Sequence, residues 1–177
     1  TTFDVSFTDA PPTVAADSAA VSAAENASAT NSGTWSDYDD PVMLSASTGT
    51  LAQNDDGKWS WSGTGDEDAP YTVTITATNA DGSTATATFA VSFSDVPPTV
   101  AADNVSIAIN EGQTATNTGV FADYDDAVTI SVSEGTITTS GSTSGSWNWS
   151  MPYGDDGSHV IVVTATNADG SSSSTSR

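Results

Sequence analysis

Cysteine is absent from the 177-residue chain, and basic residues are scarce, with 2 Lys plus Arg against 23 Asp plus Glu. Without cysteine, no disulfide can brace the fold and no thiol chemistry is available. The net charge of −21 disfavours nucleic acid and anionic membranes, because their phosphates are repelled by such a surface. The composition suits a salt-rich extracellular setting, in which cations screen the acids or are bound by them.

Long apolar runs and catalytic constellations are also lacking. No stretch of about 18 apolar residues occurs, so we expect no membrane insertion. The single histidine, His159, has Tyr71 as its counterpart in the internal repeat described next, and no Ser/His/Asp set or His/Cys cluster recurs. Paired carboxylates are frequent, but without a cleft they do not make a glycosidase pair. We therefore predict no catalytic residues and no enzymatic activity.

The sequence does contain a long internal repeat. Three segments recur almost unchanged: 11–17 at 97–103, 37–40 at 123–126, and 76–82 at 164–170. The offset is 86 residues (97 minus 11) and becomes 88 (164 minus 76) after an insertion around Ser140–Ser146. A period of this size corresponds to a domain rather than to a solenoid turn. The repeat predicts two tandem domains, 11–96 and 97–177, preceded by a segment 1–10.

Apolar and aromatic residues alternate with small polar ones in both copies, as in Phe89, Val91 and Phe93. This period of two, interrupted by Asn/Asp/Gly turns, is typical of β-strands, and no window favours a helix. The fold class predicted is all-β: two tandem immunoglobulin-like β-sandwich domains arranged end to end. We expect strands at 12–24, 28–36, 42–47, 50–54, 57–62, 71–79 and 83–93, and at 98–110, 114–122, 127–133, 136–140, 145–150 and 159–167.

Three motifs carry a family resemblance: Asn-Ser-Gly-Thr-Trp-Ser-Asp at 31–37, Gly-Lys-Trp-Ser-Trp at 57–61, and the strand and turn at 72–82. They resemble the tandem Ig-like repeats, relatives of PKD-like and cadherin-like repeats, of large bacterial surface and secreted adhesin-type proteins. The resemblance implies an extracellular or cell-surface β-sandwich in a repeat array, often stiffened by calcium. It is specific for architecture and weak for activity.

Acidic residues gather in the loops that up-and-down strand geometry brings to one end of each domain, and the loop 66–68 of the first domain would face the second. Carboxylate oxygens supplied by several loops suit Ca²⁺, so one interpretation is a calcium site that stiffens the junction between domains. The other is that Asp and Asn occupy these turns for conformational reasons and remain solvated. The candidate ligands are Asp9, Asp37, Asp39, Asp40, Asp66, Asp68, Asp81, Asp95, Asp123, Asp125, Asp126 and Asp169.

The aromatic pairs have two interpretations as well. Trp59 with Trp61, and Trp147 with Trp149, could form a sugar-stacking platform of a carbohydrate-binding module. Because each pair lies on one face of a strand, packing in the core is favoured. Tyr38 and Tyr124, inside acidic loops, are expected to pack as lids.

The first residues of the chain repeat a strand that belongs at the end of a domain. Residues 1–9 match residues 87–95, which places Phe3, Val5 and Phe7 on Phe89, Val91 and Phe93. The segment 171–177 supplies none of these three apolar positions. One hypothesis is donor-strand complementation, in which residues 1–9 complete the second domain of another copy and build a head-to-tail filament. The alternative is a section of a longer array, such as spacer repeats of a giant adhesin, in which adjacent repeats of the same polypeptide are the partners.

Overall fold

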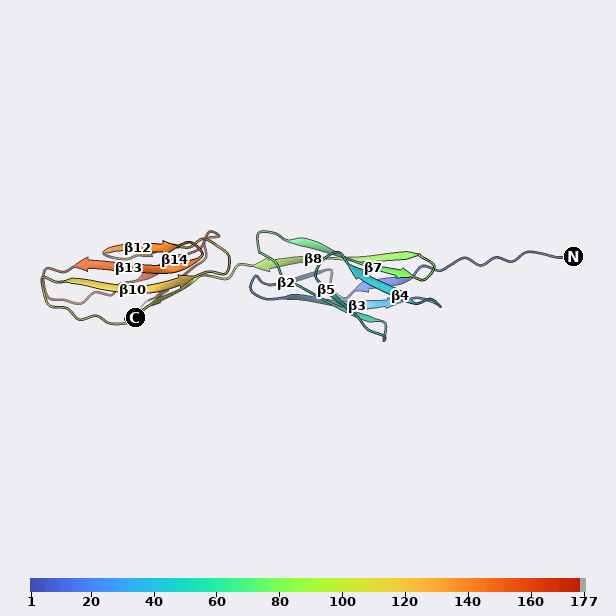
Figure 1. Ribbon diagram of the computed structural model, residues 1–177, viewed down its shortest axis with the longest axis horizontal. Coiled ribbons are helices and arrows are strands. Elements are labelled where there is room, and N and C mark those ends of the chain that lie inside the picture. Colours follow the sequence, from blue (N-terminus) through green and yellow to red (C-terminus); the bar gives the residue numbers. More distant parts are fainter. Residues whose placement is uncertain (176–177) are drawn as a thin grey trace. The chain divides into compact units, whose positions relative to one another are not determined.

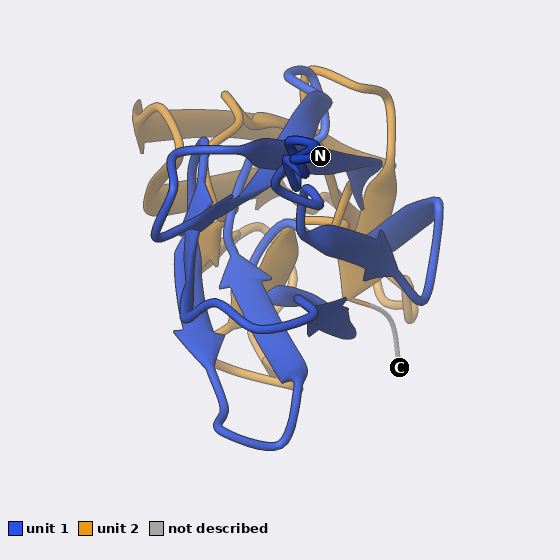
Figure 2. Cartoon of the chain, turned by 90° about the vertical axis from the view of Figure 1, so that its right-hand side faces the viewer, with its two compact units in different colours: residues 1–94 blue, residues 95–177 orange. Residues whose placement is uncertain are grey.

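The computed structural model describes residues 1–175, and within that range the regular elements are all strands. The chain divides into two compact units, Thr1–Ser94 (unit 1) and Asp95–Arg177 (unit 2), which Figure 2 colours separately. The all-β class expected from the alternating pattern is confirmed. In the described residues, no helix is long and apolar enough to cross a membrane.

Unit 1 consists of two four-stranded sheets (Figure 1). The first sheet has the order β1-β3-β6-β5, and its strands are β1 (Thr13–Ala16), β3 (Ala29–Ser36), β5 (Thr50–Gln53) and β6 (Lys58–Gly63). The second has the order β2-β8-β7-β4, and its strands are β2 (Ala20–Ala24), β4 (Val42–Ala46), β7 (Tyr71–Asn79) and β8 (Thr84–Ser94). All pairs are antiparallel except β2 with β8, which is parallel.

The single strand expected at 12–24 is wrong, because the chain changes sheets at Asp17–Ala19. β1 pairs with β3, whereas β2 pairs with β8 of the other sheet. Side chains of β3 hold the crossing: Ser32 Oγ donates to Asp17 Oδ2 over 2.5 Å, and Asn31 Nδ2 donates to the Ser18 carbonyl over 2.9 Å. The Asn31 bond satisfies the backbone carbonyl of Ser18 where the sheet ladder is interrupted.

The core of unit 1 lies between its sheets and is aromatic. Trp59 and Trp61, at 1% and 2% exposure, point inward from β6 because alternate residues of a strand share one face. Phe89 of β8 meets both rings, stacked on Trp59 at 6.3 Å and edge-on to Trp61 at 5.0 Å. Gly33 of β3 allows the ring of Trp59 to lie directly against the backbone.

Unit 2 repeats this plan with one strand fewer in its second sheet. Its first sheet has the order β12-β13-β10-β9, built from β9 (Thr99–Ala102), β10 (Thr114–Ala122), β12 (Thr136–Gly141) and β13 (Ser144–Pro152). Its second has the order β11-β14-β15, built from β11 (Thr129–Val132), β14 (Val163–Thr166) and β15 (Ser172–Thr175). Trp147 and Trp149 of β13 are buried in its core.

Two expectations for unit 2 need correction. The strand expected at 98–110 ends at Ala102, as β1 ends at the equivalent Ala16 of unit 1, and the one expected at 159–167 begins only at Val163. Residues 172–175 form β15, which pairs with β14 over four residues; Ser176 and Arg177 lie outside the described residues. Segments 106–110 and 159–162, whose counterparts in unit 1 pair with β8, form no strand.

We predict that Gly33→Ala destabilises unit 1 by about 1–3 kcal/mol, the usual range for overpacking a core. A Cβ at this position would overlap the carbonyl oxygen of Ala15 and the ring of Trp59. Gly119→Ala should have a similar effect in unit 2, where the overlap is with Ala101 and Trp147. Urea unfolding followed by tryptophan fluorescence measures both. Gly154→Ala is the control, since its Cβ would meet nothing within 4 Å; equal midpoints for Gly33→Ala and wild type would contradict the packing.

Candidate functional site

A buried asparagine organises the acidic end of unit 1. Asn79, the last residue of β7, is 4% exposed. Its Nδ2 donates to Asp9 Oδ1 over 3.1 Å and to Asp37 Oδ2 over 3.4 Å, and its Oδ1 accepts from the backbone N–H of Ser83. The Ser83 hydroxyl also donates to Asp9. One side chain thus connects the incoming chain, the loop after β3 and the loop after β7.

The acids predicted for this end of unit 1 are brought together. Single carboxylate oxygens of Asp9, Asp40 and Asp81 lie within 4.8 Å of one another, as do those of Asp37, Asp39 and Asp40. Asp66 and Asp68 lie elsewhere, in the loop between β6 and β7, at the opposite end of β7 from Asn79. There Asp66 Oδ1 accepts from the N–H of Asp68 over 2.9 Å.

The carboxylates at this end of unit 1 affect the pKa values of one another. The backbone N–H of Asp40 donates to Asp37 and, as the largest effect, holds the pKa of Asp37 below its ordinary value. Burial first, and then the charges of Asp81, Asp39, Asp37 and Asp9, raise the pKa of Asp40. Ionised carboxylates in this arrangement repel one another, and a cation among them would relieve that repulsion.

Unit 2 repeats the asparagine arrangement. Asn167, 5% exposed, donates to Asp95 Oδ1 over 2.6 Å and to Asp123 Oδ2 over 3.5 Å, and its Oδ1 accepts from the N–H of Ser171. Asp123 Oδ1 accepts from the N–H groups of Asp125 and Asp126, as Asp37 does from Asp39 and Asp40. Asp169 lies in the turn that follows Asn167. The structural role of both asparagines was not predicted, because Asn-Ala-Asp-Gly is also an ordinary turn sequence.

A pair of carboxyl groups in unit 1, those of Glu25 and Glu67, was also not predicted from the sequence. Glu25, in the turn between β2 and β3, is 1% exposed. A hydrogen bond to its carboxyl is the main reason that the pKa of Glu67 is raised to about 7. Acids at these positions recur in unit 2 as Glu111 and Asp155, which is the signal that an alignment of the two copies could have used.

The tryptophan pairs lie in the cores, which confirms packing as their role. Trp59, Trp61, Trp147 and Trp149 are all at most 5% exposed, so their rings present no stacking platform. Tyr38 and Tyr124, expected to pack as lids, are instead 91% and 58% exposed. That expectation was wrong because the turns are held by Asp37 and Asp123 and leave the rings in solvent.

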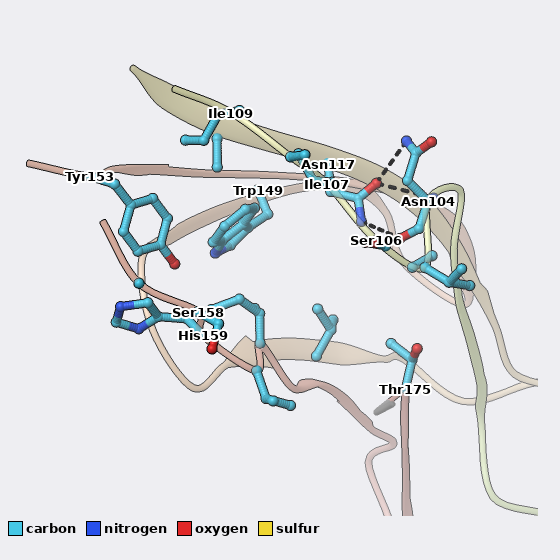
Figure 3. A pocket seen from close by; sticks show the side chains of 18 of the residues that line it. Asn104, Ser106, Ile107, Ile109, Asn117, Trp149, Tyr153, Ser158, His159 and Thr175 are labelled. Carbon is cyan, nitrogen blue, oxygen red and sulfur yellow. Dashed lines mark hydrogen bonds between the residues drawn. The ribbon is translucent and has the colours of Figure 1, made fainter. Parts of the chain in front are cut away.

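Unit 2 contains an open groove of about 870 Å³. Figure 3 shows Ile107 and Ile109 on one side, Ser158 and His159 on the other, and the ring of Trp149 between them, with Tyr153 near one end. Ile107 and Ile109 are 39% and 40% exposed, which is unusual for isoleucines facing a core.

In unit 1, the corresponding space is filled by the second half of β8. Phe89, Val91 and Phe93 are 2%, 0% and 7% exposed there. Phe89 lies opposite Val73 and Val91 opposite Tyr71 in the ladder with β7, while β2 pairs with the other edge of the same segment. By the offset of 88, Val73 and Tyr71 correspond to Ile161 and His159, which line the groove.

The predicted assembly residues lie outside the sandwich of unit 1. Residues 1–10 form no strand, and Figure 1 shows them leaving the sandwich as an extended segment. Phe3, Val5 and Phe7 are 88%, 64% and 93% exposed. Their alternate spacing places three apolar side chains on one side of an extended segment.

Residues 8–92 match the family described as bacterial Ig domain, which confirms the resemblance found in the motifs. No curated protein matches the chain significantly. Among solved structures, the titin domains Z1Z2, crystallised in complex with telethonin, share 16% identity at a TM-score of 0.49, over 96% of this chain and 95% of that one. The Yersinia pseudotuberculosis adhesin InvE shares 17% identity at a TM-score of 0.36, over 93% and 57%. Fibronectin(III)-like modules of Clostridium thermocellum CbhA share 18% at 0.34, over 93% and 90%.

The carboxyl pair makes the stability of unit 1 depend on pH. The folded pKa of Glu67, about 7, exceeds its ordinary value of 4.5, so the folded state holds a proton that the unfolded state has lost. This contribution is complete below about pH 4.5 and disappears as pH rises through 7. We therefore expect a falling melting temperature between pH 5 and pH 8, measured by circular dichroism in a chelating buffer.

Glu67→Gln should flatten this pH dependence, because a glutamine remains neutral throughout. Asp55→Asn, in the exposed loop between β5 and β6, is the matched control and should retain the slope. A slope that survives unchanged in Glu67→Gln would show that the pair is not its source.

Proposed function

Since residues 8–92 match the bacterial Ig domain family, we propose that the chain is an extracellular or cell-surface structural protein whose copies join head to tail into a fibre. Domains of this family are typically structural rather than enzymatic. The main supporting observation is that the N-terminal segment has the same apolar pattern as the second half of β8. That part of β8 fills a space in unit 1 whose counterpart in unit 2 is an open groove. A donor at one end and an acceptor at the other give a contact that does not close on itself, which is the condition for a filament.

The free energy gained by burying apolar side chains supports the proposal that copies are joined by a donated strand. Burying a Val or Phe side chain contributes about 1.5–3 kcal/mol. Three such residues together approach the whole stability of an average domain, roughly 5–15 kcal/mol. A sandwich whose groove stays open therefore has a strong driving force to acquire a strand.

The alternative function is a spacer in a giant adhesin, in which the groove is filled by a strand of the same polypeptide. The two proposals differ in what the 177-residue chain does alone, because only the first requires another copy. A carbohydrate-binding module is less well supported, since the tryptophans that would stack on a sugar are in the cores.

We also propose that the acidic end of unit 1 binds Ca²⁺. Asp9, Asp40 and Asp81 each offer one carboxylate oxygen within 4.8 Å of the others, and hard oxygen ligands are the kind that Ca²⁺ takes. Asn79 would orient Asp9, and the ion would supply the positive charge that the chain lacks, fixing the incoming segment against the loop after β7. The equivalent asparagine of unit 2, Asn167, donates a hydrogen bond to Asp95, so we extend the proposal to the equivalent acids of that unit.

For calcium, the prediction is a rise in melting temperature that chelation reverses. At a calcium concentration 100 times the dissociation constant, the free energy of unfolding increases by about 2.7 kcal/mol. Asp40→Asn should reduce the effect, whereas Asp55→Asn should not. A melting temperature that is the same in calcium and in chelator would remove this part of the proposal.

For assembly, the prediction concerns deletion of residues 1–7, which removes the three apolar side chains and leaves Asp9 in place. Wild type should form filaments visible by negative-stain electron microscopy, and the shortened chain should be a monomer by light scattering. Replacing Asp4 by Ala, an exposed change within the same segment, should leave filaments intact. Filaments from the deletion variant, or none from wild type, would contradict the proposal.

A further inference from the structure

We propose that the groove of unit 2 binds Phe3, Val5 and Phe7 of a second copy in one defined register, as a strand that continues β15 and completes the sheet. This inference rests on the proposed head-to-tail function and deepens it by specifying the site and its occupant. The template is unit 1, where β8 fills the same position with the same alternating pattern.

The antiparallel side of the site is fixed by the ladder of unit 1. There Val73 lies opposite Phe89, Thr72 opposite Ala90 and Tyr71 opposite Val91. The offsets of the repeat convert these pairs to Ile161 with Phe3, Val160 with Asp4, and His159 with Val5. The register places Phe3 where Phe89 lies in unit 1, against the equivalents of Trp59 and Trp61, which are Trp147 and Trp149.

The parallel side is fixed in the same way by β2. Val21 lies beside Val91 and Ala23 beside Phe93 in unit 1. The corresponding pairs are Ile107 with Val5 and Ile109 with Phe7. Residues 105–110 contain the apolar alternation of a strand but form no ladder, and an inserted strand would supply the hydrogen-bond partners that their backbone needs. Both walls of the groove should therefore become strands on binding.

One position departs from the template. In unit 1, Gly65 leaves room for Phe93, since a Cβ there would lie 2.5 Å from the Phe93 ring. Its equivalent in unit 2 is Tyr153, whose ring lies 4.8 Å from that of His159. Phe7 must therefore pack against or displace Tyr153, so Phe3 and Val5 are the main anchors. We expect Phe3→Ala to weaken binding on the order of 100-fold, as for truncating a core aromatic.

Electrostatic repulsion opposes the binding of the second copy. Glu111, Asp155 and Asp156 line the groove, and the donor segment carries Asp4 between its anchors. In the proposed register Asp4 lies opposite Val160, which is 63% exposed, so its carboxylate stays in solvent. Association should therefore strengthen with added salt, because screening reduces the repulsion and leaves apolar burial unchanged.

The experiment pairs two variants that cannot assemble alone. The acceptor lacks residues 1–7. The donor retains them, but its own groove is filled in cis by placing the sequence of residues 88–94 after Thr175, together with Tyr153→Gly to recreate the space beside Phe93. Each should be monomeric by light scattering, and their mixture should give a one-to-one complex that does not grow. Phe3→Ala in the donor should weaken the complex, and Thr2→Ala should not.

The outcomes separate this inference from the proposed function. If the two variants stay apart while wild type still forms filaments, the strand inference is wrong and assembly uses another surface. If wild type is itself monomeric and residues 105–110 are already protected from hydrogen exchange, both the inference and the fibre are wrong. Should the cis-filled donor fail to fold, Ile161→Lys replaces it as the blocked variant. Its control is Thr138→Lys, an exposed change in β12 that lies outside the groove, and the same two measurements apply.

Discussion

The structure depends on one strand placed between two others. In unit 1, the second half of β8 pairs with β7 on one edge and with β2 on the other, and its inward side chains meet the two core tryptophans. Ladder pairing and apolar burial are therefore supplied by the same residues. In unit 2, the segments equivalent to the two neighbours of that strand, 106–110 and 159–162, are irregular and line an open groove.

At the acidic end of each unit, carboxylates that repel one another are held close together by a buried asparagine. Asn79 and Asn167 are buried and each donates to carboxylates from separate segments. A neutral amide connects acids without adding charge, so it fixes the loops and leaves the repulsion among the acids in place. The raised pKa of Asp40 reflects burial and that repulsion.

The sequence predicted the class of fold and most strands because alternation and Asn/Asp/Gly turns are local signals. β7 and β10 agree with their predicted ranges, and the burial of the tryptophan pairs was expected from their spacing. The division of 12–24 between two sheets was not, because it depends on bonds from Asn31 and Ser32 in a strand distant in sequence. The Glu25–Glu67 pair was not predicted for the same reason, since its two acids are brought together only in the folded unit. The groove was implied by comparing the two copies, but its walls, Ile107, Ile109 and Ile161, became visible only when the neighbouring strands were in place.

The central claim is that residues 3–7 of one copy complete the sheet of another in a defined register, and the absence of cysteine allows a direct measurement. Asp4→Cys and Val160→Cys, introduced into the same chain, would be cross-strand neighbours in the assembled state at a Cα separation of about 5 Å, which a disulfide can span. Oxidation should then link chains into covalent ladders on a denaturing gel. Asp4→Cys with Ser158→Cys, two residues out of register, should link poorly. Equal crosslinking by both pairs, or by neither in material that has assembled, would contradict the account.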